Sequence, residues 1–172
     1  MGNQKIIGLV GYKNSGKTTF SEKLISFGSN KGLKIGTIKH HGHGGPPQLE
    51  SVNTDSSKQF EAGAVVSSVE GGGRLSLQAS SDHLSLHDIM KIYESFPLDL
   101  IVFEGYKNEK FPKILFIRTQ KDLYLLDYVS NIVAVVSWMP IDDLPTQLQC
   151  FLIEDDSTIM NWVFSFLGFD IA

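Results

Sequence analysis

Residues 11–18 read Gly-Tyr-Lys-Asn-Ser-Gly-Lys-Thr and fit the phosphate-binding pattern G-x-x-x-x-G-K-[ST] without a mismatch. Gly11 and Gly16 allow close backbone approaches that a Cβ would block, so successive N–H groups can point at phosphate oxygens. In such a loop Lys17 reaches the β- and γ-phosphates, and the hydroxyl of Thr18 ligates Mg²⁺. The segment therefore predicts a nucleotide site. Its predicted nucleotide-binding residues are Gly11, Tyr12, Lys13, Asn14, Ser15, Gly16, Lys17, Thr18 and Thr19.

A magnesium-nucleotide site also needs a carboxylate at the end of a neighbouring strand, where it holds the metal's water shell or polarises an attacking water. Glu104 follows the apolar run 98–103, "LDLIVF", at the strand end where open α/β sheets bind their ligands. Asp99 opens the same strand and would lie at the opposite edge. We therefore predict Glu104 as the acid that acts with Lys17, the two being the predicted catalytic residues, and Asp55 as a second candidate beside the metal.

Lys39, His40, His41 and His43 form a cationic segment in an otherwise acidic chain. A lysine with several histidines at the end of a strand suits a second anionic ligand, either a phosphate or a polar heterocycle. A transition-metal site is an alternative, although no cysteine lies near and the glycines dictate no ligand geometry. A solvated loop without a ligand is the third interpretation.

The elements that must position these residues alternate along the chain. Apolar and β-branched runs predict strands, and helical spacing of apolar residues predicts helices. The expected strands are 5–10, 33–39, 98–103, 113–118 and 131–136, and the expected helices are 18–29, 55–62, 85–96 and 157–167. Strands 64–69 and 74–79 flank three glycines as a hairpin. We predict one α/β domain over residues 1–172, of the P-loop NTPase class, with a mainly parallel sheet, helices on both faces and a β-hairpin extension.

The bulk composition restricts the class of partner. With 15 Lys and Arg against 19 Asp and Glu, the net charge of −4 provides no global field for nucleic acid or an anionic membrane. Cys150 is the single cysteine and lies in an apolar context, which predicts a buried thiol and suits a reducing compartment. The N-terminal segment enters the glycine loop directly and fits neither a signal peptide nor a spanning helix. We therefore expect a cytoplasmic protein.

Four segments together resemble the accessory protein family of molybdopterin-guanine dinucleotide biosynthesis, MobB. They read "GLVGYKNSGKTT", "IGTIKHHGHG", "DSSKQFEAGA" and "IVFEGYKNEKFPKILFIR", and they span roughly residues 5 to 136. The phosphate loop is shared by many families, whereas the T-I-K-H segment and the E-G-[FY]-K segment are far more specific. The segment before Asp55 departs from the family pattern because it lacks a basic side chain.

The resemblance implies a P-loop GTP-binding protein that assists the guanylyltransferase attaching GMP to molybdopterin, and it implies a homodimer. By matched position, Lys17 and Thr18 would bind phosphate and Mg²⁺, Glu104 would be the Walker B acid, and Asp55 would lie by the metal. The segment of Lys39 and His40 would face molybdopterin or the partner enzyme.

Three functions remain open at this stage. The first is a GTP-binding accessory protein, at most a slow GTPase, because the phosphate loop offers no general base or arginine finger. The second is a metallochaperone GTPase that uses His40, His41 and His43. The third is a small-molecule phosphotransferase. Residues 119–122, "TQKD", keep only Asp122 of the guanine-reading pattern N-K-x-D and are weak evidence for GTP over ATP.

Overall fold

The computed structural model describes residues 4–42 and 54–170 of the chain. The described residues divide into two compact units. Residues 4–42 and 96–170 belong to the first unit, and residues 54–95 belong to the second. The single domain over residues 1–172 stays a prediction.

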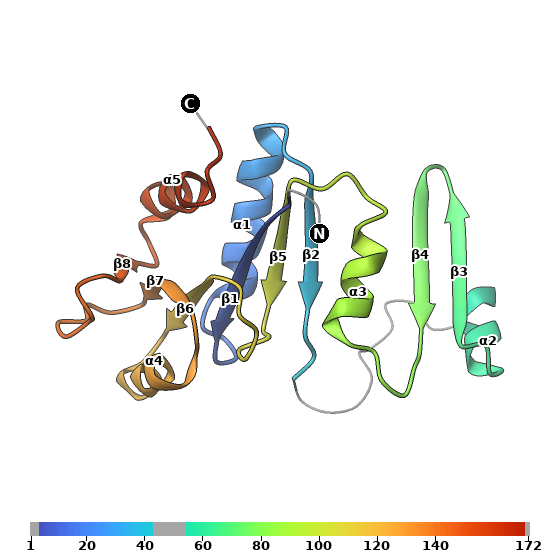
Figure 1. Ribbon diagram of the computed structural model, residues 1–172, viewed down its shortest axis with the longest axis horizontal. Coiled ribbons are helices and arrows are strands. Elements are labelled where there is room, and N and C mark those ends of the chain that lie inside the picture. The colour runs from blue at the N-terminus through green and yellow to red at the C-terminus, as the bar shows by residue number, and fades with distance from the viewer. Residues whose placement is uncertain (1–3, 43–53, 171–172) are drawn as a thin grey trace. The chain divides into compact units, whose positions relative to one another are not determined.

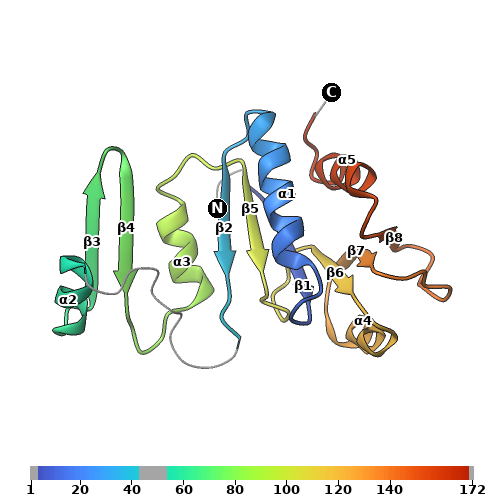
Figure 2. The same ribbon diagram turned by 180° about the vertical axis from the view of Figure 1, so that it is seen from behind.

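The first unit is built on a six-stranded sheet in the order β2-β5-β1-β6-β7-β8, which can be followed across Figure 1 and from behind in Figure 2. Each pairing between neighbours in this order is parallel. The interiors of β5 and β6 are buried, as expected of central strands that are covered on both faces. The strands are β1 Lys5–Gly11, β2 Ile35–Lys39, β5 Leu100–Glu104, β6 Lys113–Ile117, β7 Ile132–Ser137 and β8 Gln149–Leu152.

Helices cover both faces of this sheet. On one face, α1 (Lys17–Asn30) and α5 (Asp156–Phe166) contribute side chains to a core that includes Leu9 of β1. The next residue of β1, Val10, points to the other face, where α4 (Leu125–Tyr128) packs after the short 3₁₀ helix η1 (Gln120–Tyr124). The alternation of side chains along β1 thus separates the two cores. The predicted α/β class, with a mainly parallel sheet and helices on both faces, is confirmed.

The second unit contains α2 (Asp55–Glu61), β3 (Val66–Gly71), β4 (Arg74–Ala79) and α3 (Leu86–Tyr93). β3 and β4 pair antiparallel across Gly72 and Gly73, which both have positive φ, so the predicted hairpin is confirmed. The hydroxyl of Thr54 caps α2 by accepting the N–H of Ser57.

Two predictions about the C-terminal third were incomplete or wrong. The sequence patterns predicted neither the helical turns over residues 120–128 nor the edge strand β8. Cys150, expected to be buried, is exposed. β8 is the last strand of the sheet and pairs with β7 alone, so an apolar sequence context at this position does not ensure cover on both faces.

Candidate functional site

The loop between β1 and α1 has a backbone that requires its glycines. Gly11 and Gly16 have φ values of 153° and 98°, in the region that favours glycine. A Cβ on Gly11 would lie 2.7 Å from the carbonyl oxygen of Phe116, and one on Gly16 would lie 2.7 Å from Cδ1 of Ile153. The loop is therefore packed tightly against strand ends and has no room for side chains at these positions.

Two side chains that follow strands distant in the sequence hold the middle of the loop by hydrogen bonds. Nη1 of Arg118, directly after β6, donates to the carbonyl oxygen of Asn14 at 2.9 Å. Nε1 of Trp138, directly after β7, donates to the carbonyl oxygen of Ser15 at 2.9 Å. Sequence reasoning missed both residues. The available signal was their position, because each immediately follows a strand whose carboxyl end lies at the ligand-binding edge.

The ammonium of Lys17 is hydrogen-bonded to its own loop. Nζ of Lys17 donates to the carbonyl oxygen of Tyr12 at 2.6 Å and to Oγ of Ser15 at 3.3 Å. Burial lowers the pKa of Lys17; the nearby positive charges of Lys107 and Lys39 also lower it, whereas the Glu104 carboxylate raises it. A phosphate bound in the loop would supply the negative charge that this half-buried ammonium lacks.

The predicted metal ligands Thr18 and Glu104 lie together. Oγ1 of Thr18 is 3.3 Å from each carboxylate oxygen of Glu104, although the two residues are 86 positions apart in the sequence. The parallel register explains the contact, because it pairs Glu104 at the end of β5 with Leu9 near the end of β1. A hydroxyl and a carboxylate are oxygen donors that suit Mg²⁺, which usually keeps several waters and binds substrate phosphates as well.

Asp99 lies at the other end of β5, as predicted. Its Oδ2 accepts the backbone N–H of Lys34 at 2.8 Å, which joins the starts of two neighbouring strands. Of the two acidic residues that flank the apolar run, Glu104 is the one at the loop edge.

The second-ligand candidates partly converge on the same carboxylate. Lys39 is paired with Glu104 in the register of β2 and β5, and its Nζ lies 3.1 Å from Oε1 of Glu104. The side chain of Lys39 is 63% exposed and that of Glu104 only 17%, so the ammonium covers a largely enclosed acid. The N–H of His40 donates to the Glu104 carbonyl at 2.9 Å, and the His40 ring lies 4.8 Å from the ring of Tyr106. His41 is exposed, and His43 lies outside the described residues.

The remaining predicted residues occupy different surroundings. Lys13, Asn14 and Thr19 are exposed, and Tyr12 is 40% exposed with Nζ of Lys107 4.9 Å from its ring centre. Asp55 belongs to the second unit, where it pairs with Lys58 at 3.8 Å. Its role as a metal ligand stays a prediction.

Asp122 has a local structural role. Its Oδ2 accepts the backbone N–H groups of Arg118 and Thr119, each at 2.9 Å. Burial raises the pKa of Asp122, but these hydrogen bonds outweigh that effect and hold the pKa below its ordinary value. The aspartate that resembled part of a guanine-reading pattern therefore uses one oxygen to hold the turn after β6.

Two absences hold for residues 4–42 and 54–170. Within these ranges no three His, Cys, Asp or Glu side chains gather closely enough to hold a metal ion by themselves. No helix in the same ranges combines the length and the apolar character needed to cross a bilayer.

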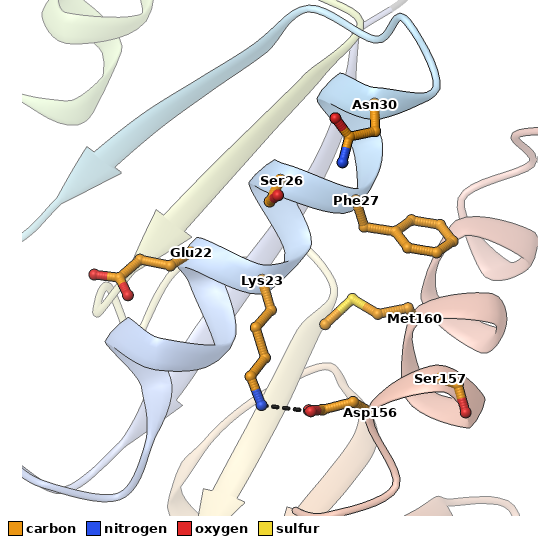
Figure 3. Close-up of a pocket in the computed structure, with 8 residues that line it drawn as sticks. All are labelled: Glu22, Lys23, Ser26, Phe27, Asn30, Asp156, Ser157 and Met160. Atoms are coloured by element: carbon orange, nitrogen blue, oxygen red, sulfur yellow. Dashed lines mark hydrogen bonds and ion pairs between the residues drawn. The ribbon is translucent and has the colours of Figure 1, made fainter.

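A separate groove lies between α1 and α5, with a volume of about 660 Å³. Figure 3 shows Phe27 and Met160 pointing into it and an ion pair between Lys23 and Asp156 at one end. None of its lining residues comes from the phosphate loop. The candidate nucleotide site at Lys17, Thr18 and Glu104 is therefore separate from this groove.

The parallel sheet, the glycine-dependent loop before α1 and the juxtaposed Thr18 and Glu104 define a P-loop α/β protein. The family model for molybdopterin guanine dinucleotide synthesis protein B matches residues 6–138. The chain therefore belongs to this family, as the resemblance in its motifs indicated.

Relatives and a solved structure agree with this assignment. The chain is 38% identical over 131 residues, 76% of its length and 75% of the relative's, to a probable molybdopterin-guanine dinucleotide biosynthesis adapter protein of Bacillus subtilis. It is 30% identical over 171 residues, 98% and 95% of the two chains, to such an adapter protein of Haemophilus influenzae. The crystal structure of Bacillus subtilis MobB aligns with a TM-score of 0.82 at 32% identity and covers 94% of this chain and 96% of that one.

Proposed function

We propose that the chain binds GTP with Mg²⁺ and acts as an adapter in the synthesis of molybdopterin guanine dinucleotide. The observation that carries this proposal is the contact of Thr18 with both carboxylate oxygens of Glu104 beside Lys17. Membership of the family and the names of the two relatives support the biosynthetic role.

Each part of the site has a defined task in this proposal. The loop N–H groups and the positive end of the 14-residue helix α1 hold the phosphates. Lys17 leaves the Tyr12 carbonyl for the β- and γ-phosphates, and Thr18 with Glu104 positions the metal and its waters. Hydrolysis is slow, because loop 11–18 contains no arginine and no general base.

Lys39 links this site to a second ligand. Mg²⁺ bound at Glu104 would compete with Lys39 for the carboxylate and would free the exposed ammonium of Lys39 from its ion pair. With His40 beside it at the end of β2, it then faces an anion, for which the phosphate of molybdopterin is the candidate. The partner is the guanylyltransferase that attaches GMP to molybdopterin.

A homodimer belongs to the same proposal. The register of the hairpin places Val66, Leu75 and Leu77 on one face, where they are 55%, 54% and 45% exposed. The opposite face meets α2, since Oγ of Ser67 donates to the carbonyl of Ser56 at 2.9 Å. A second copy would bury the apolar face. Light scattering should give a dimer mass for the wild type and a monomer mass for L75E/L77E.

The test is calorimetric titration with GTP, ATP and GDP in Mg²⁺, repeated with GTP in the presence of molybdopterin-loaded guanylyltransferase. We expect GTP to bind best and its affinity to change when the loaded enzyme is present. Tight ATP binding combined with indifference to the enzyme would favour the small-molecule phosphotransferase. Stoichiometric Ni²⁺ or Zn²⁺ binding that His41→Ala abolishes would favour the metallochaperone.

A further inference from the structure

Trp138 and Arg118 lie at the carboxyl ends of two strands on one side of the phosphate loop. The loop follows β1, and the order β5-β1-β6-β7 places Glu104 on one side of it and these two residues on the other. Both contact neighbouring carbonyls of the loop, those of Asn14 and Ser15. The two side chains are therefore fixed at the edge of the nucleotide site that is opposite the metal ligands.

This placement fits the polarity of a bound nucleotide. In the proposed function, Mg²⁺ held by Thr18 and Glu104 would bind the β- and γ-phosphates on the β5 side. The nucleoside is joined to the other end of the triphosphate and extends away from the metal. The ends of β6 and β7 are the neighbouring elements in that direction.

The Trp138 ring offers a planar surface suited to a base, and the Arg118 guanidinium lies over the same ring. The Trp138 side chain is held by its hydrogen bond to Ser15, yet the residue is 49% exposed. The Arg118 guanidinium carbon lies 5.4 Å from the centre of the Trp138 ring, and Arg118 is exposed as well. Indole rings and guanidinium planes are the groups on which proteins stack bases. A large aromatic side chain that is exposed but held in place is already organised for this role.

Arg118 adds a preference among bases. A guanidinium carries five N–H donors, and the Asn14 carbonyl accepts one of them. Guanine presents two acceptors, O6 and N7, on one edge, whereas adenine presents an acceptor beside a donor. The backbone of Arg118 is held by Asp122, so the start of its side chain has a fixed position.

We propose that Trp138 and Arg118 form the base subsite of the nucleotide site, where Trp138 stacks against the base and Arg118 donates to the acceptor edge of guanine. This inference rests on the proposed function and assigns two residues to the recognition of GTP. Neither residue belongs to the phosphate-loop motif.

The test compares GTP with inorganic tripolyphosphate, which fills a phosphate site and has no base. The background is Trp162→Phe, because Trp162 packs on α5 against Phe151 and Phe166 and its removal leaves Trp138 as the only tryptophan. Trp138 fluorescence should change with Mg·GTP and much less with Mg·tripolyphosphate.

Trp138→Ala should weaken Mg·GTP binding by about 5- to 150-fold, the range for stacking one base on an aromatic side chain. The readout is the ratio of the dissociation constants of GTP and tripolyphosphate, because damage to the loop would weaken both. Trp138→Phe keeps a ring without the N–H and should restore most of the ratio. An unchanged ratio in Trp138→Ala would overturn the stacking role.

Arg118→Ala should lower the preference for GTP over ATP by about 5- to 150-fold, the range for a bidentate contact to a base edge. Arg118→Lys should lose most of this preference while retaining the positive charge. An unchanged GTP-to-ATP ratio would overturn the role of Arg118. Suppose that tripolyphosphate binds the wild type and that Lys17→Ala abolishes this binding. Unchanged ratios in the Trp138 and Arg118 variants would then reject the base subsite and leave the proposed function standing. If neither GTP nor tripolyphosphate binds the wild type, the proposed function fails.

Discussion

Gly16→Ala should destabilise the protein for two separable reasons. Gly16 has a φ of 98°, where an alanine costs about 1–2 kcal/mol relative to its ordinary backbone region. Its new Cβ would also lie 2.7 Å from Cδ1 of Ile153, and overpacking of this kind costs about 1–3 kcal/mol. The reduced entropy of the unfolded chain offsets about 0.4–1 kcal/mol of this loss. We expect a net loss of about 3 kcal/mol in the free energy of unfolding.

Gly32→Ala is the matched control. Gly32 has a φ of 84°, and a Cβ there would meet nothing within 4 Å, so the backbone cost is present without the overlap. We expect a loss of about 1 kcal/mol or less. In the Gly16→Ala background, Ile153→Val deletes the δ-methyl that the new Cβ meets and should recover about 1–2 kcal/mol.

The assay is urea unfolding of the wild type, the two alanine variants, the double variant Gly16→Ala/Ile153→Val and the single variant Ile153→Val. The m-value must stay constant across these proteins. Equal losses for the two alanine variants would contradict the tight packing of the phosphate loop. So would a double variant no more stable than Gly16→Ala.

Three other outcomes are expected. Lys39→Met should raise the affinity for Mg²⁺ in the presence of GTP by about 1.5- to 5-fold, measured by metal titration, because an exposed lysine no longer competes for Glu104; a weaker affinity would contradict the competition. Asp122→Asn should cost about 1–2 kcal/mol at neutral pH, because two backbone N–H groups lose a charged acceptor. The folded pKa of Asp122 is lowered, so its contribution is complete above the ordinary value of 3.8 and is lost as pH falls through the folded pKa; a gap between wild type and variant that stays constant in acid unfolding would refute this. Although Cys150 is exposed, neighbouring atoms partly desolvate its thiol and raise its pKa, so its labelling by a disulfide reagent at pH 8 should be slower than that of free cysteine and should accelerate with rising pH.

Motifs of neighbouring residues correctly predicted the segments whose conformation depends on those residues alone. The phosphate loop and the hairpin at Gly72 and Gly73 each depend on residues close together in the sequence. Glu104 was predicted without local contact to the loop, because parallel strands bring their carboxyl ends to one edge of a sheet.

The contacts of Arg118 and Trp138 could not be predicted in the same way. Each joins the loop to a residue more than 100 positions away, and strand register together with side-chain direction decides which carbonyl is reached. β8 has only four residues, and η1 has too few turns for a helical period to emerge. Cys150 was assigned from apolar neighbours, which do not reveal that its strand ends the sheet.

The most direct measurement is a calorimetric titration of Mg·GTP into the wild type, Lys17→Ala and Lys23→Ala. Lys23 is a lysine of the same helix that pairs with Asp156 in the groove of Figure 3, so it controls for the loss of one positive charge. We predict saturable binding of one GTP per chain to the wild type and to Lys23→Ala, and none to Lys17→Ala. Equal binding to all three proteins, or no binding to the wild type, would contradict the assignment of the nucleotide site.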